Sequence, residues 1–300
     1  MTSRRIALMM GGHSAEREVS LSSGQAVANA LKELGHEVIA INDINELKSL
    51  ARHEIDLVFN LLHGADGEDG RLAAWLALEK LPFTGCEYKA AALSWHKDVA
   101  KTMVTKQGIL TPPFQVLNQP EQLVIDATQG PWIVKPAGEG SSVGLVKVNH
   151  ADELAAAVQQ VFNLTDTVLV ESYIKGIECT VGLVGDVVLP VVSIHPAGEL
   201  YDYNAKYASG TTQYHCPPDF SKDLQNQLQT DARQICQLLG IKGWSRVDFI
   251  VDEAGRCWFL EVNTTPGMTA TSLLPKAAKV YGWDFKQLVA EIMKTGDVHE

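Results

Sequence analysis

The sequence lacks the long apolar runs that membrane proteins carry. No stretch approaches the roughly 18 consecutive apolar residues that a membrane-spanning helix needs. Arg4 and Arg5 lie near the start, but the apolar segment behind them, residues 6–10, has only the length of a strand and leads into two glycines. We therefore expect neither a signal peptide nor a membrane partner.

Cysteine is also scarce. The five cysteines are widely scattered, and no two of them are separated by just two residues. An odd number without a C-x-x-C pair favours reduced thiols in a cytoplasmic protein over a disulfide framework or a zinc site.

Positive charge is in deficit. The chain has 25 lysines and arginines against 36 aspartates and glutamates, which gives a formal net charge of -11. This balance argues against a nucleic acid or an anionic membrane as the main partner. It does not argue against ATP, because a few lysines gathered at one place can hold phosphates in an acidic protein.

What the sequence does contain is typical of a soluble enzyme with two or three packed units. It has 300 residues, of which 46% are hydrophobic and 20% charged. In the first unit, residues 1–96, strand and helix patterns alternate, which predicts a mainly parallel sheet with helices on its faces. Ligands of such sheets bind beyond the carboxyl ends of the strands. The expected elements are strands at 5–10, 37–41 and 55–62 and helices at 20–34 and 70–81.

The rest of the chain has a different pattern, which predicts α+β structure in a central unit (97–185) and a C-terminal unit (186–300). The C-terminal unit also contains a long polar loop at 198–218. The expected central elements are a helix at 90–108, strands at 132–135, 144–148 and 168–171, and a helix at 152–162. The expected C-terminal elements are a helix at 221–239, a hairpin at 246–263 and a helix at 284–294.

The hairpin at 246–263 carries the sharpest functional pattern. Polar and apolar residues alternate on both arms around a predicted four-residue turn at 253–256. This register places Asp248 opposite Glu261, and Arg246 opposite Asn263, on one face. The other face is apolar and is expected to lie in the core: Val247, Phe249, Val251, Trp258, Leu260 and Val262.

Two directly opposed carboxylates repel each other unless a cation lies between them. Oxygen ligands from Asp, Glu and Asn, without Cys or His, suit magnesium, which usually shares its shell with phosphate. The alternative is a solvated hairpin face on which Arg246 forms a salt bridge with Asp248.

A glycine- and serine-rich loop follows a predicted strand that ends in Lys135. The backbone N–H groups of such a loop can bind phosphate oxygens, and the lysine adds charge. The segment, residues 133–144, is not a Walker A loop, because it contains no Gly-Lys-Ser/Thr leading into a helix. An ordinary turn between two strands is the alternative.

Weaker candidates lie elsewhere. The extended segment 168–174 can present backbone groups to an adenine with Tyr173 against the ring, or it is a plain buried strand. Glu16, in a polar loop at a helix start, either pairs with a substrate ammonium or caps the helix. His63 either lines a site or is an ordinary loop histidine. The tyrosine-rich loop 198–218 is either a lid that excludes water or a surface loop.

Taken together, five segments in this order resemble the D-alanine–D-alanine ligase family of ATP-grasp enzymes. The resemblance runs from Gly11 to about Leu288. The segments are GGHSAEREVS (11–20), HGADGEDG (63–70), EGSSVG (139–144), YDYNAKY (201–207) and EVNTTPGMT (261–269). One departure is Ser94-Trp95-His96 before Lys97, where relatives more often have Met-Asp.

The resemblance implies a three-part ATP-grasp architecture and a set of site residues. The implied ATP contacts, to the phosphates, the adenine and the ribose, are Lys97, Lys135, Ser142, Glu171, Tyr173, Ile174 and Glu178. The implied ligands of two magnesium ions, with manganese as an alternative, are Asp248, Glu261 and Asn263. The residues implied at the first D-alanine are Glu16, Ser141, Tyr207 and His63. Those implied at the oxyanion are Arg246 and the Gly267 N–H. Those implied at the carboxylate of the second D-alanine are Lys206, Ser272 and the Leu273 N–H.

The implied reaction is ATP-dependent ligation of two D-alanines through a D-alanyl phosphate, in a cytoplasmic homodimer that supplies peptidoglycan precursors. Tyr207 favours an amine as the second nucleophile over the hydroxyl of D-lactate. Two other interpretations remain open. One is a different ATP-grasp carboxylate–amine ligase, and the other is a nucleotide-binding regulatory domain without catalysis.

Overall fold

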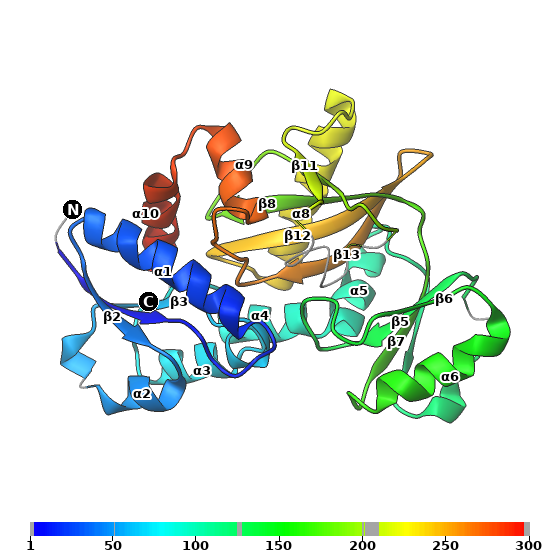
Figure 1. The fold of residues 1–300 in the computed structure, drawn as a ribbon, viewed down its shortest axis with the longest axis horizontal. Coiled ribbons are helices and arrows are strands. Elements are labelled where there is room, and N and C mark those ends of the chain that lie inside the picture. Colours follow the sequence, from blue (N-terminus) through cyan, green and yellow to red (C-terminus); the bar gives the residue numbers. More distant parts are fainter. Residues whose placement is uncertain (1–2, 51, 125–127, 200, 202–209, 297–300) are drawn as a thin grey trace.

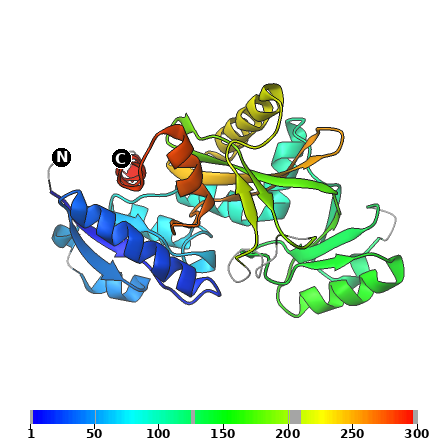
Figure 2. The same ribbon diagram turned by 45° about the horizontal axis from the view of Figure 1, so that its top comes forward.

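The computed structural model describes residues 3–50, 52–124, 128–199, 201 and 210–296, and these form three sheets (Figure 1). In both views the N-terminal and central sheets lie toward opposite ends of the molecule, with the C-terminal sheet between them (Figure 2). Three short 3-10 helices lie in the connections: η1 (Arg52–Glu54), η2 (Gly64–Asp66) and η3 (Pro120–Gln122).

The N-terminal sheet is parallel, in the order β2-β1-β3, as the sequence predicts. Alternate residues of β1 enter two cores, since Ile6 packs in the core that contains α1 and Ala7 in the core that contains α2 and α3. The carboxyl ends of β1 and β3 open toward the rest of the molecule. The elements are β1 (Arg5–Met9), α1 (Arg17–Glu33), β2 (Glu37–Ile41), α2 (Ile44–Ser49), β3 (Leu57–Asn60) and α3 (Arg71–Leu78).

The central sheet is antiparallel, in the order β4-β7-β5-β6, and α6 covers one of its faces. Leu154, Val158 and Val161 are buried along α6 at helical spacing, so this face of the helix packs on the sheet. The elements are β4 (Phe114–Leu117), β5 (Trp132–Pro136), β6 (Val146–Val148), α6 (Ala151–Phe162) and β7 (Val168–Ser172).

The C-terminal sheet has six strands, and α8 and α9 pack on it. The last helix, α10, shares its core with α1 of the N-terminal unit. The elements are β8 (Gly176–Val184), β9 (Val187–Val188), β10 (Val192–His195), β11 (Gln213–His215), α8 (Lys222–Leu239), β12 (Trp244–Asp252), β13 (Cys257–Asn263), α9 (Leu273–Tyr281) and α10 (Phe285–Thr295).

The parallel N-terminal sheet and the antiparallel sheets that follow confirm the mixed α/β and α+β fold class. The single helix expected at 90–108 is wrong, because the chain becomes extended at His96 (ψ 92°) and separates α4 (Tyr88–Trp95) from α5 (Lys97–Lys106). The unit boundaries at 96/97 and 185/186 stay predictions. The strand β8 begins at Gly176 and pairs within the C-terminal sheet.

The hairpin β12–β13 has the predicted register at its functional end and a different one toward its turn. Asp248 lies opposite Glu261, and Arg246 opposite Asn263, as expected. A β-bulge follows, so that Phe249 pairs with Phe259. From there to the turn, the residues of the two strands are paired one position away from the predicted register.

The expected core positions of Trp258 and Leu260 are therefore wrong. Phe259 is fully buried instead, while Trp258 and Leu260 are half-buried. The extra residue in β13 is Leu260, and its side chain lines a pocket on the functional side of the sheet. An alternating pattern contains no information about such an inserted residue.

Within the described part of the chain, no helix combines the length and the apolar character needed to cross a bilayer.

The bulge predicts which aromatic residue of β13 stabilises the fold. Phe259→Ala should lower the free energy of unfolding by about 3–5 kcal/mol, because it removes a buried ring. This ring packs edge-on against the ring of Phe249, with 6.3 Å between the two ring centroids. Trp258→Ala should cost clearly less, since Trp258 is only partly buried. Urea denaturation of both variants measures the difference, and a larger loss for Trp258→Ala would contradict the bulge.

Candidate active site

Two adjoining pockets lie where the three sheets meet. The first is lined by all of the residues predicted to contact ATP: Lys97, Lys135, Ser142, Glu171, Tyr173, Ile174 and Glu178. The second is lined by the described residues predicted at the two D-alanines and the oxyanion: Glu16, His63, Ser141, Arg246, Gly267, Ser272 and Leu273. Tyr201 and Glu261 line both pockets.

The first pocket combines apolar walls with an array of charges. Ile250 and Leu260 of the hairpin face Tyr173 and Ile174 of the segment after β7. On the outer side of the segment, Lys147 Nζ lies 4.0 Å above the Tyr173 ring. A flat aromatic base and a charged phosphate chain are the kind of ligand that fits apolar walls beside lysines.

Lys97 and Lys135 supply the positive charge of this pocket. Lys97 begins α5, and its Nζ lies 3.2 Å from Glu261 Oε2 and donates to the Glu139 carbonyl. Lys135, near the end of β5, lies with its Nζ 3.0 Å from Glu171 Oε2. Each lysine therefore has a carboxylate partner that also lines the pocket.

A third lysine, Lys101, was missed by the sequence interpretation. It lies one helical turn beyond Lys97 on α5, and its Nζ is 3.1 Å from Glu171 Oε1. Burial lowers the pKa of Lys101 to about 8, against the attraction of Glu171. Burial raises the pKa of Glu171, but Lys101 and Lys135 outweigh it and lower that pKa overall. Glu171 is thus ionised at neutral pH, and Lys101 keeps most of its positive charge.

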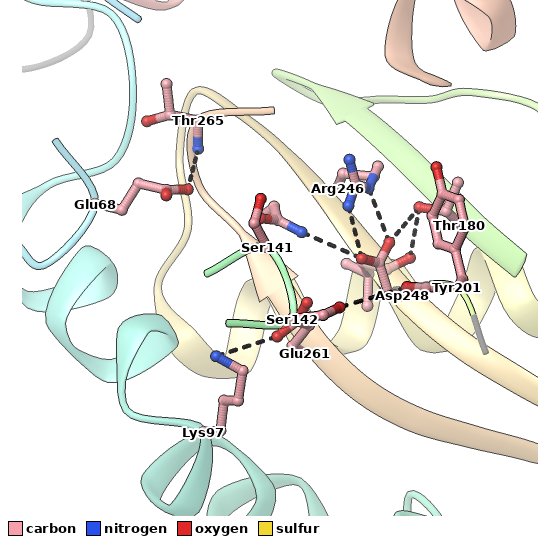
Figure 3. A network of polar contacts seen from close by, with 12 residues as sticks. Glu68, Lys97, Ser141, Ser142, Thr180, Tyr201, Arg246, Asp248, Glu261 and Thr265 are labelled. Carbon is pink, nitrogen blue, oxygen red and sulfur yellow. Dashed lines mark hydrogen bonds and ion pairs between the residues drawn. The ribbon is translucent and has the colours of Figure 1, made fainter. Parts of the chain in front are cut away.

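The polar face of the hairpin carries a two-bond ion pair (Figure 3). Arg246 donates from Nε to Asp248 Oδ1 (2.9 Å) and from Nη2 to Asp248 Oδ2 (2.8 Å). Thr180 and Asn263 also donate to this carboxylate, at 2.6 and 3.2 Å. The Arg246–Asp248 pairing is the one that the alternative interpretation contains, but Asp248 is only 4% exposed, so this face is not a solvated surface.

The predicted metal ligands offer oxygen atoms from opposed positions of the hairpin. Asp248 and Glu261 are register partners, and Asn263 follows two residues later on the same strand. No group of three or more His, Cys, Asp or Glu side chains suited to a metal occurs among the described residues. Two carboxylates and one amide oxygen fit magnesium only if phosphate oxygens complete its shell, which is how magnesium is usually held beside nucleotides.

The glycine-rich loop lies against the second pocket through its two serines. Ser141 and Ser142 both have left-handed backbone angles, with φ of 51° and 58°. Ser141 Oγ donates to Glu16 Oε1. Ser142 Oγ donates to the Tyr201 carbonyl at 3.4 Å (Figure 3). Left-handed angles cost about 1 kcal/mol or more per non-glycine residue, so these contacts hold the loop in an otherwise unfavourable form.

Glu16 and His63 come from the carboxyl ends of β1 and β3, as expected for a site above a parallel sheet. Glu16 occupies the N-cap position of α1 but makes no capping hydrogen bond with its side chain, which disfavours the capping alternative. Burial chiefly lowers the pKa of His63, and Arg246 lowers it further, although Glu16 opposes the shift. His63 is therefore neutral at pH 7.

Glu68 is a second site residue that the sequence interpretation missed. Its Oε2 accepts from the Gly64 N–H (2.8 Å) and its Oε1 from the Thr265 N–H (3.2 Å), so it joins the N-terminal loop to the loop after β13. Burial, with help from the nearby Glu16, raises the pKa of Glu68 to about 8. Its partner in the other loop is 197 residues away along the chain, which no local pattern reveals.

The remaining predicted residues surround the end of the second pocket. Ser272 precedes α9, and its Oγ accepts from the Thr269 N–H at 2.9 Å. A Cβ at Gly267 would lie 2.9 Å from Ser272 Oγ, so a glycine fits closely here. The predicted residues Lys206 and Tyr207 lie outside the described residues, and their roles stay predictions. In the same segment, Tyr201 is described, and its hydroxyl lies 3.1 Å from that of Tyr214.

Sequence comparisons agree with this geometry. Models of the D-ala D-ala ligase C-terminus and N-terminus match residues 103–294 and 42–86. A D-alanine–D-alanine ligase from Methylococcus capsulatus is 42% identical over 294 residues, which cover 97% of this chain and 95% of that protein. The chain belongs to the D-alanine–D-alanine ligase family. The predicted family resemblance is thereby confirmed.

Solved structures of this ligase family have the same fold. A D-alanine–D-alanine ligase from Bacillus anthracis complexed with ATP superposes with a TM-score of 0.87 at 29% identity, covering 99% of each chain. The VanG D-Ala:D-Ser ligase from Enterococcus faecalis gives a TM-score of 0.85 at 28% identity, covering 98% of this chain and 100% of that chain. These likenesses confirm the expected ATP-grasp architecture.

Glu68 predicts a pH-dependent contribution to stability. Its folded pKa of about 8 exceeds the ordinary value of 4.5, so between these values the folded state holds a proton that the unfolded state has lost. Stability from this group therefore falls as the pH rises from about 5 to 8. Glu68→Gln should remove this decline. The variant should also be less stable than the parent protein by about 1–3 kcal/mol at pH 5. The reason is that the NH₂ group of the glutamine faces one of the two backbone N–H donors and cannot accept a hydrogen bond from it.

Urea denaturation of the two proteins at pH 5, 6.5 and 8 measures both effects. Glu79→Gln, which alters an exposed carboxylate after α3, is the matched control and should retain the pH dependence of the parent protein. An unchanged pH dependence in Glu68→Gln would contradict the assignment.

Proposed function

We propose that the protein is an ATP-dependent ligase that joins two D-alanines through a D-alanyl phosphate. The observation that carries this proposal is the shared wall of the two pockets, formed by Tyr201 and Glu261. A phosphoryl group at the end of a nucleotide in the first pocket would lie beside a carboxylate bound in the second. Direct transfer between two substrates needs this adjacency.

In the first pocket, ATP is held at both ends. The adenine and ribose contact Glu171, Tyr173, Ile174 and Glu178, and the phosphates contact Lys97, Lys135 and Ser142. Two magnesium ions, or manganese, bound by Asp248, Glu261 and Asn263 would neutralise charge on the phosphoryl oxygens. With Asp248 holding a metal ion, Arg246, which binds Asp248 in this structure, would instead act on the substrate.

In the second pocket, the two amino acids are bound in sequence. Glu16 pairs with the ammonium of the first D-alanine and is linked through Ser141 to Tyr207, with His63 close by. Arg246 and the Gly267 N–H stabilise the oxyanion. The carboxylate of the second D-alanine is bound by Ser272, the Leu273 N–H at the start of α9, and Lys206.

The reaction proceeds in two steps at one place. The carboxylate of the first D-alanine attacks the γ-phosphorus of ATP, which gives the acyl phosphate and ADP. The amine of the second D-alanine then attacks the acyl carbon, and phosphate leaves. The loop 198–218 acts as a lid that keeps water from the acyl phosphate.

The wider biological assignment is that the dipeptide enters peptidoglycan precursor synthesis, and that the enzyme acts as a cytoplasmic homodimer. The identity of 42% to a D-alanine–D-alanine ligase supports the dipeptide over other products. The likeness to a D-Ala:D-Ser ligase makes D-serine the alternative second substrate that an assay has to include.

Phosphate release from Mg-ATP tests the proposal directly. The protein is incubated with D-alanine, L-alanine, D-alanine plus D-lactate, or D-alanine plus D-serine, and the products are identified by mass spectrometry. Release with D-alanine alone, with the mass of D-alanyl-D-alanine, is the expected result. ATP binding without release in any mixture would instead support a catalytically silent nucleotide sensor.

Replacing Arg246 tests the oxyanion role. Arg246→Ala should reduce ligation at least about 100-fold, since the tetrahedral intermediate loses a charged donor. The fold should survive, because Thr180 and Asn263 still donate to Asp248. Arg256→Ala is the control, as it removes an exposed arginine from the turn of the same hairpin. Turnover of Arg246→Ala at the rate of this control would refute the role.

A further inference from the structure

The wall of the first pocket contains a charge cluster that continues into the interior and that the proposed reaction does not use in full. Its centre is Glu171, which is 2% exposed and lies between two lysines. Lys135 Nζ approaches one carboxylate oxygen at 3.0 Å, and Lys101 Nζ approaches the other at 3.1 Å. Two cations thus share one anion, although a single lysine would neutralise it.

The two lysines differ in their surroundings. Lys101 is 0% exposed, so it lies behind the pocket wall, where its Nζ forms the ion pair with Glu171 and donates two hydrogen bonds to other groups. These groups are Thr111 Oγ1 at 2.7 Å and the Phe259 carbonyl at 3.4 Å. The rings of Phe114 and Phe259 each lie 5.9 Å from its Nζ. Lys101 is therefore fixed by groups from the segment between α5 and β4, from β13 and from the central sheet.

Lys135 has the opposite character. Its side chain is 13% exposed and lines the pocket, and its ion pair is with Glu171. A phosphate entering the pocket offers this lysine a second anion. Moving toward that anion means leaving Glu171, and a buried carboxylate that loses its last counter-charge is strongly unfavourable.

We propose that Lys101 is a positioning residue that serves as the permanent counter-ion of Glu171 and thereby lets Lys135 transfer from Glu171 to the nucleotide phosphates. This inference rests on the proposed ATP-dependent function and assigns to it a residue that touches neither substrate. Without Lys101, Lys135 stays paired with Glu171. The pocket then binds the phosphates more weakly, while the residues that contact the adenine keep their positions.

The test compares binding of ATP with binding of adenosine by isothermal titration calorimetry. In Lys101→Met the affinity for ATP should fall about ten-fold or more, the size of a lost charge-assisted contact, while the affinity for adenosine changes little. Lys106→Met removes an exposed lysine from the same helix and should leave both affinities unchanged. An equal loss for ATP and adenosine would indicate a merely structural role and overturn the proposal, as would an unchanged affinity for ATP.

The double variant Lys101→Met/Glu171→Gln keeps the test decisive if the single variant does not fold, because it leaves no unpaired buried charge. Its adenosine affinity can change, but its ratio of ATP to adenosine affinity should match or exceed that of the parent protein, since Lys135 is no longer held. A ratio well below that of the parent protein would overturn the proposal. Failure of the parent protein itself to bind ATP would instead refute the proposed function.

Discussion

The pairing of β12 with β13 is the constraint on which the site depends. One register brings Asp248 opposite Glu261, and the bulge next to that pair changes the phase of the strand within a single residue. Phe259 thereby fills the core, while Leu260 reaches the first pocket. The hairpin thus presents carboxylates, an apolar wall and a buried ring from one short segment, which strict alternation does not allow.

Around this hairpin, the described lysines and the arginine that line the two pockets each lie beside a carboxylate. Lys97 lies beside Glu261, and Lys135 beside Glu171, while Arg246 binds Asp248 with two hydrogen bonds. Under the proposed function, a phosphate chain that binds here therefore replaces a carboxylate as the partner of these side chains. A chain with a net charge of -11 can offer cations to an anion in this way, because these cations are gathered in the pocket walls.

Much of this arrangement can be predicted from local patterns in the sequence. Alternation over residues 246–263 suffices to pair Asp248 with Glu261, and the parallel N-terminal sheet follows from its strand and helix pattern. The bulge is not predictable in this way, because an inserted residue has no periodic signature. Glu68 and Lys101 could not be found either. Their pKa values are shifted because both side chains are buried against segments far along the chain. In the sequence they look like ordinary charged residues of a loop and a helix.

The packing of α10 on α1 has a consequence for how the chain folds during synthesis. Leu288 and Ile292 of α10 complete the core that contains Val27 and Leu31 of α1. The central sheet, by contrast, is covered by its own helix and has all of its strands once Ser172 is made. The α1 face of the first unit to leave the ribosome is therefore among the last apolar surfaces to be buried, since it waits for residues 285–295, and it stays open to chaperones and proteases until then.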